Sequence, residues 1–319
     1  MTDLRGLTWK QLRALSATVR SGSVTSAAKT LLVTPPAITI QLKQLERLVG
    51  APLFDRASSG FTPTEIGLEL LQTANDIERL ISRSVERISA LRAGATGSVV
   101  FGVVSTAKYI APSMVAGFGR THPDIRVTLA IGNRGEIVRG LECNEYDILL
   151  MGRPPAHIEV DSVPMGAHPH LLVAAPDHRL VGDDNILPED LLRERFLARE
   201  AGSGTRMLME RFLTRIGGGR PFDIVEMGSN ETIKQSVIAG LGIAVISGHT
   251  CMTELRDGKL AALPVDGLPL VRQWYLLHRI DRLPSKAVQI FKNYIAEQRE
   301  CFFPQLGPNG LVLAPFRSP

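Results

Sequence analysis

Small polar residues recur at three points in the later part of the chain where an apolar strand gives way to a helix. These junctions are Ser105-Thr106, Gly202-Ser203-Gly204-Thr205-Arg206 and Ser229-Asn230-Glu231. A helix N-terminus offers free N–H groups to an anion, and ligands of open α/β sheets bind at the carboxyl ends of the strands. Helix capping alone explains any one junction. Three junctions on one cleft predict a site for a small anion, with Arg206 pairing either with the ligand or within the protein.

A second set of polar residues lies on a helix expected over residues 35–49. Ser23 can cap a short helix before it, and Thr34 can cap the helix itself, with Pro35 at a position where a missing N–H costs little. Its apolar stripe consists of Ile38, Leu42, Leu45 and Val49. The polar face carries Thr39, Gln41, Lys43, Gln44 and Arg47, which can donate to base edges and phosphates. The pattern predicts a helix-turn-helix that reads a DNA major groove; an ordinary solvated helical pair is the alternative.

The basic surplus of the chain lies on this same segment. The net charge is +4, and residues 1–58 hold eight Lys and Arg against three Asp and Glu. Residues 59–95 hold four against five, and the remainder of the chain is balanced. A local surplus of this size suits docking to DNA phosphates and is too small for a histone-like binder.

Motifs of catalysis and metal binding are missing from the sequence. It contains no HExxH, GxSxG, Walker or GxGxxG pattern followed by a helix. The spacing of His168, His170 and His178 favours exposed or capping histidines over a metal triad. We therefore expect neither an enzyme nor a bound metal or cofactor.

Composition indicates a soluble globular protein of two or more domains. Hydrophobic residues make up 44% of the chain and charged residues 21%. There is no signal-peptide core and no apolar run long enough to span a bilayer, so a cytoplasmic location without membrane contact is expected. Cys143, Cys251 and Cys301 lack CxxC spacing and are expected to be packed thiols in a reducing compartment.

The segment after the helical pair changes character. Residues 52–56 and 60–64 are expected to form two short strands of a wing, after which Thr64 caps a long helix to about Arg92. The apolar positions of this helix follow steps of three and four residues: Ile66, Leu70, Ala74, Ile77, Ile81, Val85 and Ile88. Packing on its own domain is possible, but a short wing domain offers little surface to cover so long a stripe. We expect a second copy to bury Leu70, Ile77, Ile81 and Ile88, with a hinge over residues 93–97.

The remainder predicts an α/β fold of two lobes with a cleft between them. Strands over 99–104, 125–129 and 147–151 alternate with helices over 109–120 and 136–143, which implies a parallel sheet. A second set has strands over 170–175, 195–198, 224–227, 243–246 and 271–278 and helices over 205–215, 231–239 and 285–300. The tail after Phe303 is expected to be irregular.

Two groups of motifs resemble a known family. Residues 4 to about 92 resemble the N-terminal half of a LysR-type transcriptional regulator, through the helix-turn-helix, Leu53-Phe54-Asp55-Arg56 and Thr64-Glu65-Ile66-Gly67. Gly132-Asn133-Arg134-Gly135-Glu136 and residues 200–206, 229–235 and 274–279 resemble the branch that regulates Calvin-cycle, RuBisCO-type operons. The resemblance implies a winged helix-turn-helix and an effector domain of the periplasmic-binding-protein type II.

The resemblance and the residue pattern together name the site residues and partners. DNA contacts are expected from Ser23, Thr34, Pro36, Thr39, Gln41, Lys43, Gln44 and Arg56. Effector contacts are expected from Ser105, Thr106, Asn133, Gly202, Ser203, Thr205, Arg206 and Asn230. The family further implies promoter DNA, a homodimer or a homotetramer built as a dimer of dimers, RNA polymerase as a partner, and a phosphorylated metabolite or NADPH as effector.

These inferences divide the chain into four parts. They are a DNA-binding domain over 1–63, a dimerisation helix with hinge over 64–95, an effector domain over 96–302 and an irregular tail over 303–319. The rival interpretation is a two-lobed binding protein or enzyme whose helical N-terminus is not a specific DNA reader.

Overall fold

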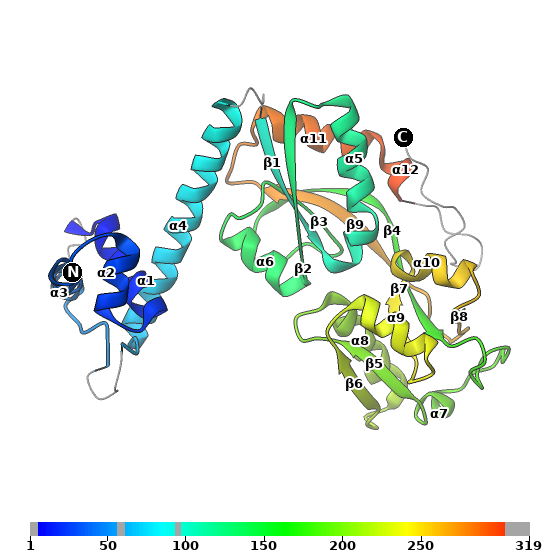
Figure 1. Ribbon diagram of the computed structural model, residues 1–319. Helices are drawn as coiled ribbons and strands as arrows, with labels where there is room; N and C mark the ends of the chain where they lie inside the picture. The colour runs from blue at the N-terminus through cyan, green and yellow to red at the C-terminus, as the bar shows by residue number, and fades with distance from the viewer. Residues whose placement is uncertain (1–5, 56–60, 93–96, 304–319) are drawn as a thin grey trace. The chain divides into compact units, whose positions relative to one another are not determined.

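The computed structural model describes residues 6–55, 61–92 and 97–303. The chain divides into two units, Met1–Glu86 and Arg87–Pro319 (Figure 1). In the ranges that the structure describes, no helix is both long and apolar enough to cross a membrane.

Three helices form the core of the first unit: α1 (Trp9–Ser21), α2 (Val24–Leu31) and α3 (Pro35–Val49). The sequence analysis did not assign α1. Ala27 and Ala28 of α2 are buried in the shared core, where their small side chains allow the helices to approach closely. Ile38, Leu42 and Leu45 of α3 are buried in the same core, which leaves the polar side of α3 facing solvent.

Of the two side-chain caps predicted for α2 and α3, one is present and one is not. Ser23 accepts a hydrogen bond from the N–H of Ser26 (3.1 Å) and caps α2 as predicted. Thr34 occupies the N-cap position of α3, but its side chain makes no capping bond, so that prediction was wrong. Pro35 and Pro36 hold the first two helical positions and lack an N–H. The next N–H, that of Ala37, donates to the backbone oxygen of Thr34 (3.0 Å).

The expected wing is reduced to a single bridge in the described residues. Phe54 pairs with Pro63, and the N–H of Asp55 donates to the oxygen of Thr62 (2.9 Å). The two predicted segments therefore pair antiparallel, although the described residues form one bridge and no longer ladder. The predicted DNA contact Arg56 and the turn that follows it lie outside the described residues.

The long helix, α4 (Glu65–Arg92), has the predicted bounds. The N–H of Gly67 donates to the hydroxyl of Thr64 (3.1 Å), which confirms the predicted cap. Leu70 and Ile77 pack partly on the core of their own unit. Ile81 and Ile88, farther along, remain exposed, so the dimerisation stripe divides into an inner and an outer part.

We expect Gly67→Ala to destabilise the first unit by roughly 1–3 kcal/mol, a typical cost of overpacking. A Cβ at Gly67 would overlap the backbone oxygen of Leu53, which the start of α4 holds against it. The matched control is Gly119→Ala in helix α5 (Ala111–Thr121), where a Cβ meets nothing within 4 Å. That change should be neutral or stabilising by up to about 1 kcal/mol. Calorimetric unfolding of the full chain measures both variants. If Gly67→Ala destabilised the protein no more than Gly119→Ala does, the packing described would be wrong.

The second unit contains a seven-stranded sheet and a two-stranded one. The strands described are β1 (Gly97–Val104), β2 (Ile125–Gly132), β3 (Ile148–Met151), β4 (Val160–Ala174), β5 (Arg195–Arg199), β6 (Asp223–Met227), β7 (Ala244–Ser247), β8 (Ala261–Ala262) and β9 (Leu270–Arg279). The helices besides α5 are the 3₁₀ turn η2 (Ser105–Tyr109), α6 (Arg134–Glu142), α7 (Pro188–Leu191), α8 (Gly204–Gly217), α9 (Asn230–Ile238), α10 (Gly248–Arg256), α11 (Lys286–Glu297) and α12 (Arg299–Phe302).

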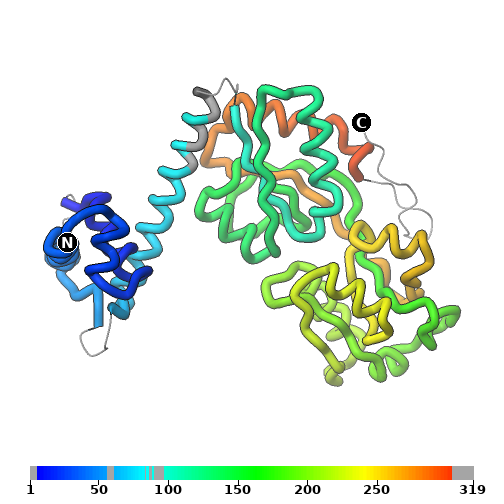
Figure 2. Tube along the Cα trace, viewed as in Figure 1, coloured from blue at the N-terminus to red at the C-terminus, as the bar shows by residue number. Residues whose placement is uncertain are grey.

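The larger sheet has the order β2-β1-β3-β9-β4-β7, with β8 beside β4. Strand β1 is parallel to both β2 and β3, which confirms the predicted parallel βαβαβ unit of the first lobe. In the second lobe β5 is parallel to β6, and the N–H of Leu197 donates to the oxygen of Ile243 (2.9 Å) just before β7. Two lobes were predicted and are present (Figure 2).

Two long antiparallel strands join the lobes. Strand β4 pairs with β9 from Val160 to His170, and the end of β4 pairs with β7. The sequence analysis placed a strand only over 170–175 and missed residues 160–169. Pro164, Gly166 and Pro169 argue against a strand in local sequence, and pairing with β9, through a bulge at Pro164–Gly166, overrides that preference.

Candidate functional site

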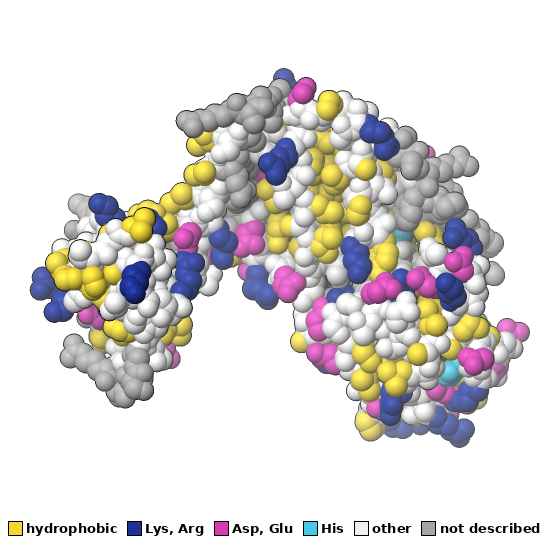
Figure 3. Space-filling view, in the orientation of Figure 1, with side chains coloured by type: hydrophobic (Ala, Val, Ile, Leu, Met, Phe, Trp, Pro, Cys, Tyr) yellow, Lys and Arg dark blue, Asp and Glu magenta, His cyan; other side chains and the backbone are white. Residues whose placement is uncertain are grey.

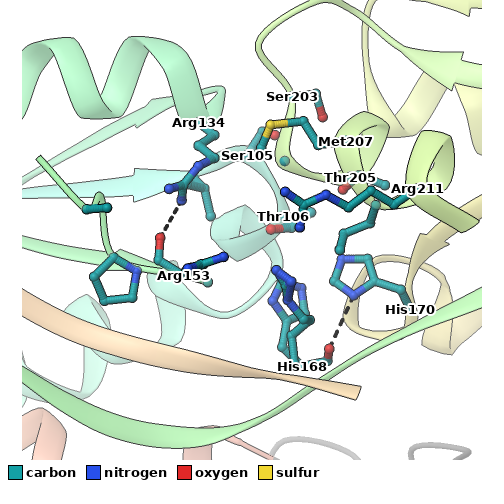
Figure 4. A pocket seen from close by; sticks show the side chains of 17 residues that line it. Ser105, Thr106, Arg134, Arg153, His168, His170, Ser203, Thr205, Met207 and Arg211 are labelled. Atoms are coloured by element: carbon teal, nitrogen blue, oxygen red, sulfur yellow. Dashed lines mark hydrogen bonds between the residues drawn. The ribbon is translucent and has the colours of Figure 1, made fainter. Parts of the chain in front are cut away.

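A cavity of about 320 Å³ lies in the second unit where the two lobes meet. Its walls come from η2, the start of α6, the loop after β3, strands β4 and β9, and the first turns of α8 (Figure 4). The lining residues are Val104, Ser105, Thr106, Arg134, Gly152, Arg153, Pro154, Ala156, His168, His170, Ser203, Gly204, Thr205, Met207, Leu208, Arg211 and Arg272. Helix starts from both lobes therefore face one space.

Four of the eight predicted effector residues line this cavity. They are Ser105 and Thr106 from η2 and Ser203 and Thr205 from the start of α8. Ser203 is the N-cap residue of α8 and makes no side-chain capping bond, so capping does not account for its hydroxyl. Two of the three predicted junctions thus converge on the cavity.

The third junction has a different role. Asn230 is buried, and its Oδ1 accepts a hydrogen bond from Arg199 Nη1 (2.6 Å). The same guanidinium group donates to Ser105 Oγ (3.2 Å) and pairs with Glu200. Asn230 therefore supports the contact between the lobes and does not line the cavity, which corrects its predicted role as an effector ligand.

Neither Asn133 nor Gly202 lines the cavity; Asn133 caps a helix, and Gly202 joins the lobes. Asn133 caps α6 by accepting from the N–H of Glu136 (2.9 Å). The N–H of Gly135 in the first lobe donates to the oxygen of Gly202 in the second (3.1 Å). A left-handed φ of 85° at Gly202 explains why glycine stands at this turn.

Arg206 pairs within the protein. It forms ion pairs with Glu210 (2.8 Å) and Glu226, and these carboxylates raise its pKa. Of the two roles that the sequence left open, ligand or internal pairing, the structure places Arg206 in the second. Its helical position points it toward β6 and away from the cavity lining.

Four other arginines supply the charge of the cavity, and the sequence analysis missed them as site residues. Arg134 and Arg153 lie on one side and Arg211 on the other, and Arg272 completes the set (Figure 4). Within the described chain, no carboxylate lines the cavity. Burial lowers the pKa of Arg134, and repulsion from Arg272 and Arg153 lowers it further. The positive charge of the cavity therefore suits a multiply charged anion.

The predicted exposure of two histidines was wrong. His168 and His170 are buried and line the cavity, and His249 lies beside them. Burial lowers the pKa of all three, to about 4 for His170 and His249, so all are neutral near pH 7. His178 fits the prediction better, since its Nδ1 accepts from the N–H of Leu180 in a turn (3.3 Å). In the described residues no group of His, Cys, Asp and Glu could hold a metal ion.

The cysteines are free thiols, as expected. Cys251 is buried, and Cys143 and Cys301 are half-buried. Burial raises the pKa of the Cys251 thiol to about 12, which makes it unreactive.

The predicted DNA-reading residues lie on an accessible face of the first unit. Thr34, Pro36, Thr39, Lys43 and Gln44 are exposed, and Ser23 and Gln41 are half-buried. The hydroxyl of Thr39 donates to the oxygen of Pro35 (3.2 Å) and keeps its lone pairs free to accept. The start of α3 therefore presents donors and a cation in one region, as direct base reading requires.

Both units match models of one protein family. Residues 9–68 match the bacterial regulatory helix-turn-helix protein, lysR family, and residues 92–300 match the LysR substrate binding domain. The chain belongs to the LysR family of transcriptional regulators. This confirms the resemblance seen in the sequence and sets aside the rival interpretation as an enzyme.

Two transcriptional regulators match this LysR-family chain over most of its length. It is 45% identical over 304 residues to the HTH-type transcriptional regulator CbbR of Xanthobacter flavus, covering 95% of this chain and 91% of that one. It is 38% identical over 293 residues to the RuBisCO operon transcriptional regulator of Acidithiobacillus ferrooxidans, covering 92% and 94%.

Two solved structures are similar to this chain. One is the regulatory domain of CcmR from Synechocystis PCC6803 in complex with 2-PG, with a TM-score of 0.60 and 32% identity over 65% of this chain and 99% of that one. The other is full-length CbnR complexed with its target DNA, with a TM-score of 0.69 and 21% identity over 92% and 100%. The second supports the fold alone.

Proposed function

We propose that this LysR-family regulator binds a promoter of carbon-fixation genes through α3 and responds to a small phosphorylated metabolite in the arginine-lined cavity. The main support for an anionic effector is that four arginines line the cavity. In the described part of the chain no carboxylate lines it. The relatives named for CbbR and the RuBisCO operon support the target genes. The 2-PG of the CcmR structure supports a compact phosphorylated acid.

The size of the cavity favours a compact metabolite over NADPH. At about 320 Å³ the space is at the lower end of the range for small-molecule pockets. NADPH would have to extend well beyond the lining residues, whereas 2-phosphoglycolate (2-PG) fits within them. We accordingly place the phosphate of the effector among Arg134, Arg153, Arg211 and Arg272.

The proposed assembly is a homodimer or homotetramer on promoter DNA, with RNA polymerase as the downstream partner, in the cytoplasm. An exposed apolar stretch of α4 supports pairing of two copies. Two helix-turn-helix units in one particle would read two half-sites.

Titration of labelled promoter DNA with and without 2-phosphoglycolate tests the function. An effector acts only if it binds two arrangements of the regulator with different affinity, and typical couplings change DNA affinity by about 5–150-fold. The expected result is a shift in affinity or footprint on the promoter and none on a scrambled duplex. Equal affinity for both duplexes at fixed salt would overturn specific DNA reading.

Lys43→Ala should weaken binding to promoter and scrambled duplex alike and lower the salt slope by about one. Lys43 is exposed on α3 and can reach a phosphate, whose neutralisation releases counterions. The matched control is Lys286→Ala, an exposed lysine at the start of α11 in the second unit, which should leave the slope unchanged. Fluorescence anisotropy at several salt concentrations measures both slopes. Identical slopes for the two variants would mean that α3 does not lie against the backbone.

A further inference from the structure

One buried polar atom in the cavity wall has no partner in the protein. Among the lining residues in the described chain, only His168 has a fully buried side-chain polar atom, Nδ1, that makes no hydrogen bond. The four arginines project from four different elements, so an anion can bind them in more than one orientation. Nδ1 of His168 instead has one fixed position, on strand β4, which joins the two lobes. An unpaired buried polar atom is costly, and a ligand that pairs it recovers that cost.

The ring of His168 is fixed in place. It stacks on the indole of Trp274, with ring centroids 3.8 Å apart and planes 13° from parallel. Its Nε2 lies 3.0 Å from Ser247 Oγ at the end of β7. A Cβ built on Gly152 would lie 3.7 Å from Nδ1, so the backbone of this lining residue passes close to that nitrogen. Figure 4 shows His168 among the lining residues, below Thr106 in this view.

The surroundings keep this ring neutral. Burial lowers the pKa of His168, and His170 on β4, His249 on α10 and Arg272 on β9 lower it further. The hydroxyl of Ser247 can donate to Nε2 or accept from it, so Nδ1 can in turn donate or accept. A neutral imidazole of this kind suits an oxygen of the ligand that carries a hydroxyl proton or a shared negative charge.

We propose that His168 determines effector specificity by a hydrogen bond between Nδ1 and a second oxygen function of the effector, distinct from the phosphate bound by the arginines. This rests on the proposed function, since it takes the cavity as the effector site. The ligand class is a phosphorylated acid or alcohol, and His168 separates such compounds from a simple phosphate ester.

Two substitutions distinguish the two ring nitrogens. In His168→Asn the amide occupies the place of Nδ1, and in His168→Gln the amide reaches the place of Nε2 beside Ser247. The proposal predicts that the Gln variant loses about tenfold in affinity for 2-phosphoglycolate, the usual effect of one hydrogen bond, and that the Asn variant retains most of it. Affinity for methyl phosphate should be unchanged in both. A merely structural role through Ser247 would give the opposite order.

A second variant leaves His168 itself intact. Gly152→Ala places a methyl group 3.7 Å from Nδ1, where it would crowd a ligand oxygen bound to that nitrogen. It should lower affinity for 2-phosphoglycolate by about tenfold without weakening methyl phosphate. Binding is read from the fluorescence of Trp274, which stacks on His168. A Trp9→Phe background makes Trp274 the only tryptophan, since the chain has two.

The outcomes separate this inference from the proposed function. If neither 2-phosphoglycolate nor methyl phosphate binds the parent protein, the anionic effector site fails and this inference fails with it. If both bind, but the Gln and Gly152→Ala variants keep the parent preference for 2-phosphoglycolate, the role of His168 is overturned and the effector site stands. Loss of that preference in these two variants and its retention in the Asn variant supports the proposal.

Discussion

Arg272→Met should lower the affinity for a phosphorylated effector by at least about tenfold, because charge-assisted hydrogen bonds contribute roughly 1.5–3 kcal/mol. The same change should leave the free protein no less stable. Burial lowers the pKa of Arg272, and repulsion from Arg211 and Arg153 lowers it further. A cation whose pKa falls on folding is less favourable in the folded state, so removing its charge costs no folding free energy. Calorimetric titration with 2-phosphoglycolate and thermal unfolding without ligand measure the two effects.

The matched control is Arg279→Met on the same strand. Arg279 pairs with Asp281 (2.5 Å), an interaction that raises its pKa, and it does not line the cavity. Its loss should leave effector affinity unchanged and should not raise stability. A drop in stability for Arg272→Met with unchanged affinity would mean that its charge serves the fold and not a ligand.

The predicted strands and helices largely agree with the structure because their signals are local. Alternating or continuous apolar residues defined β1, β2 and β3, and the capping residue Thr64 marked the start of α4. The first half of β4 had no such signal. Its prolines and buried histidines form a strand only because β9, which lies more than a hundred residues later, pairs with them.

The candidate site was predictable only where its residues lie next to a helix start. Ser203 and Thr205 were found for that reason, but the nearest cation, Arg206, does not line the cavity. Along α8 the residues at steps of three and four from Gly204, namely Met207, Leu208 and Arg211, face the cavity. Arg206 lies about 100° away from Met207 around the helix and pairs with Glu226 instead. This periodicity was present in the sequence and could have indicated Arg211.

No local pattern could have assembled the complete arginine set. Arg134, Arg153, Arg211 and Arg272 come from α6, the loop after β3, α8 and β9, and only the tertiary fold brings them together. The histidines illustrate the same limit. Exposure is the usual expectation for histidines near a turn, and the burial of His168 depends on its stacking with Trp274 on another strand.

The outer part of the apolar stripe on α4 leads to a prediction about how copies of the chain assemble. Leu70, Ala74 and Ile77 contact the core of the first unit. Beyond them Ile81, Val85 and Ile88 remain 42%, 56% and 52% exposed, and Figure 3 shows hydrophobic side chains along this helix. Large apolar side chains at steps of four and three on one helix face are typical of a coiled-coil seam. We expect a second copy of the chain to cover them.

Ile81→Asp should therefore dissociate the proposed dimer and weaken promoter binding by about 10²–10⁴-fold, because two linked half-site contacts become independent. An unpaired carboxylate in the seam is far more costly than one in water. The control is Ser82→Asp, which adds the same charge about 100° around the helix at an exposed position. Light scattering and anisotropy on a two-half-site duplex should separate the variants. If the Ile81→Asp variant keeps the parental mass and affinity, this stripe is not the seam, and another surface must join the copies.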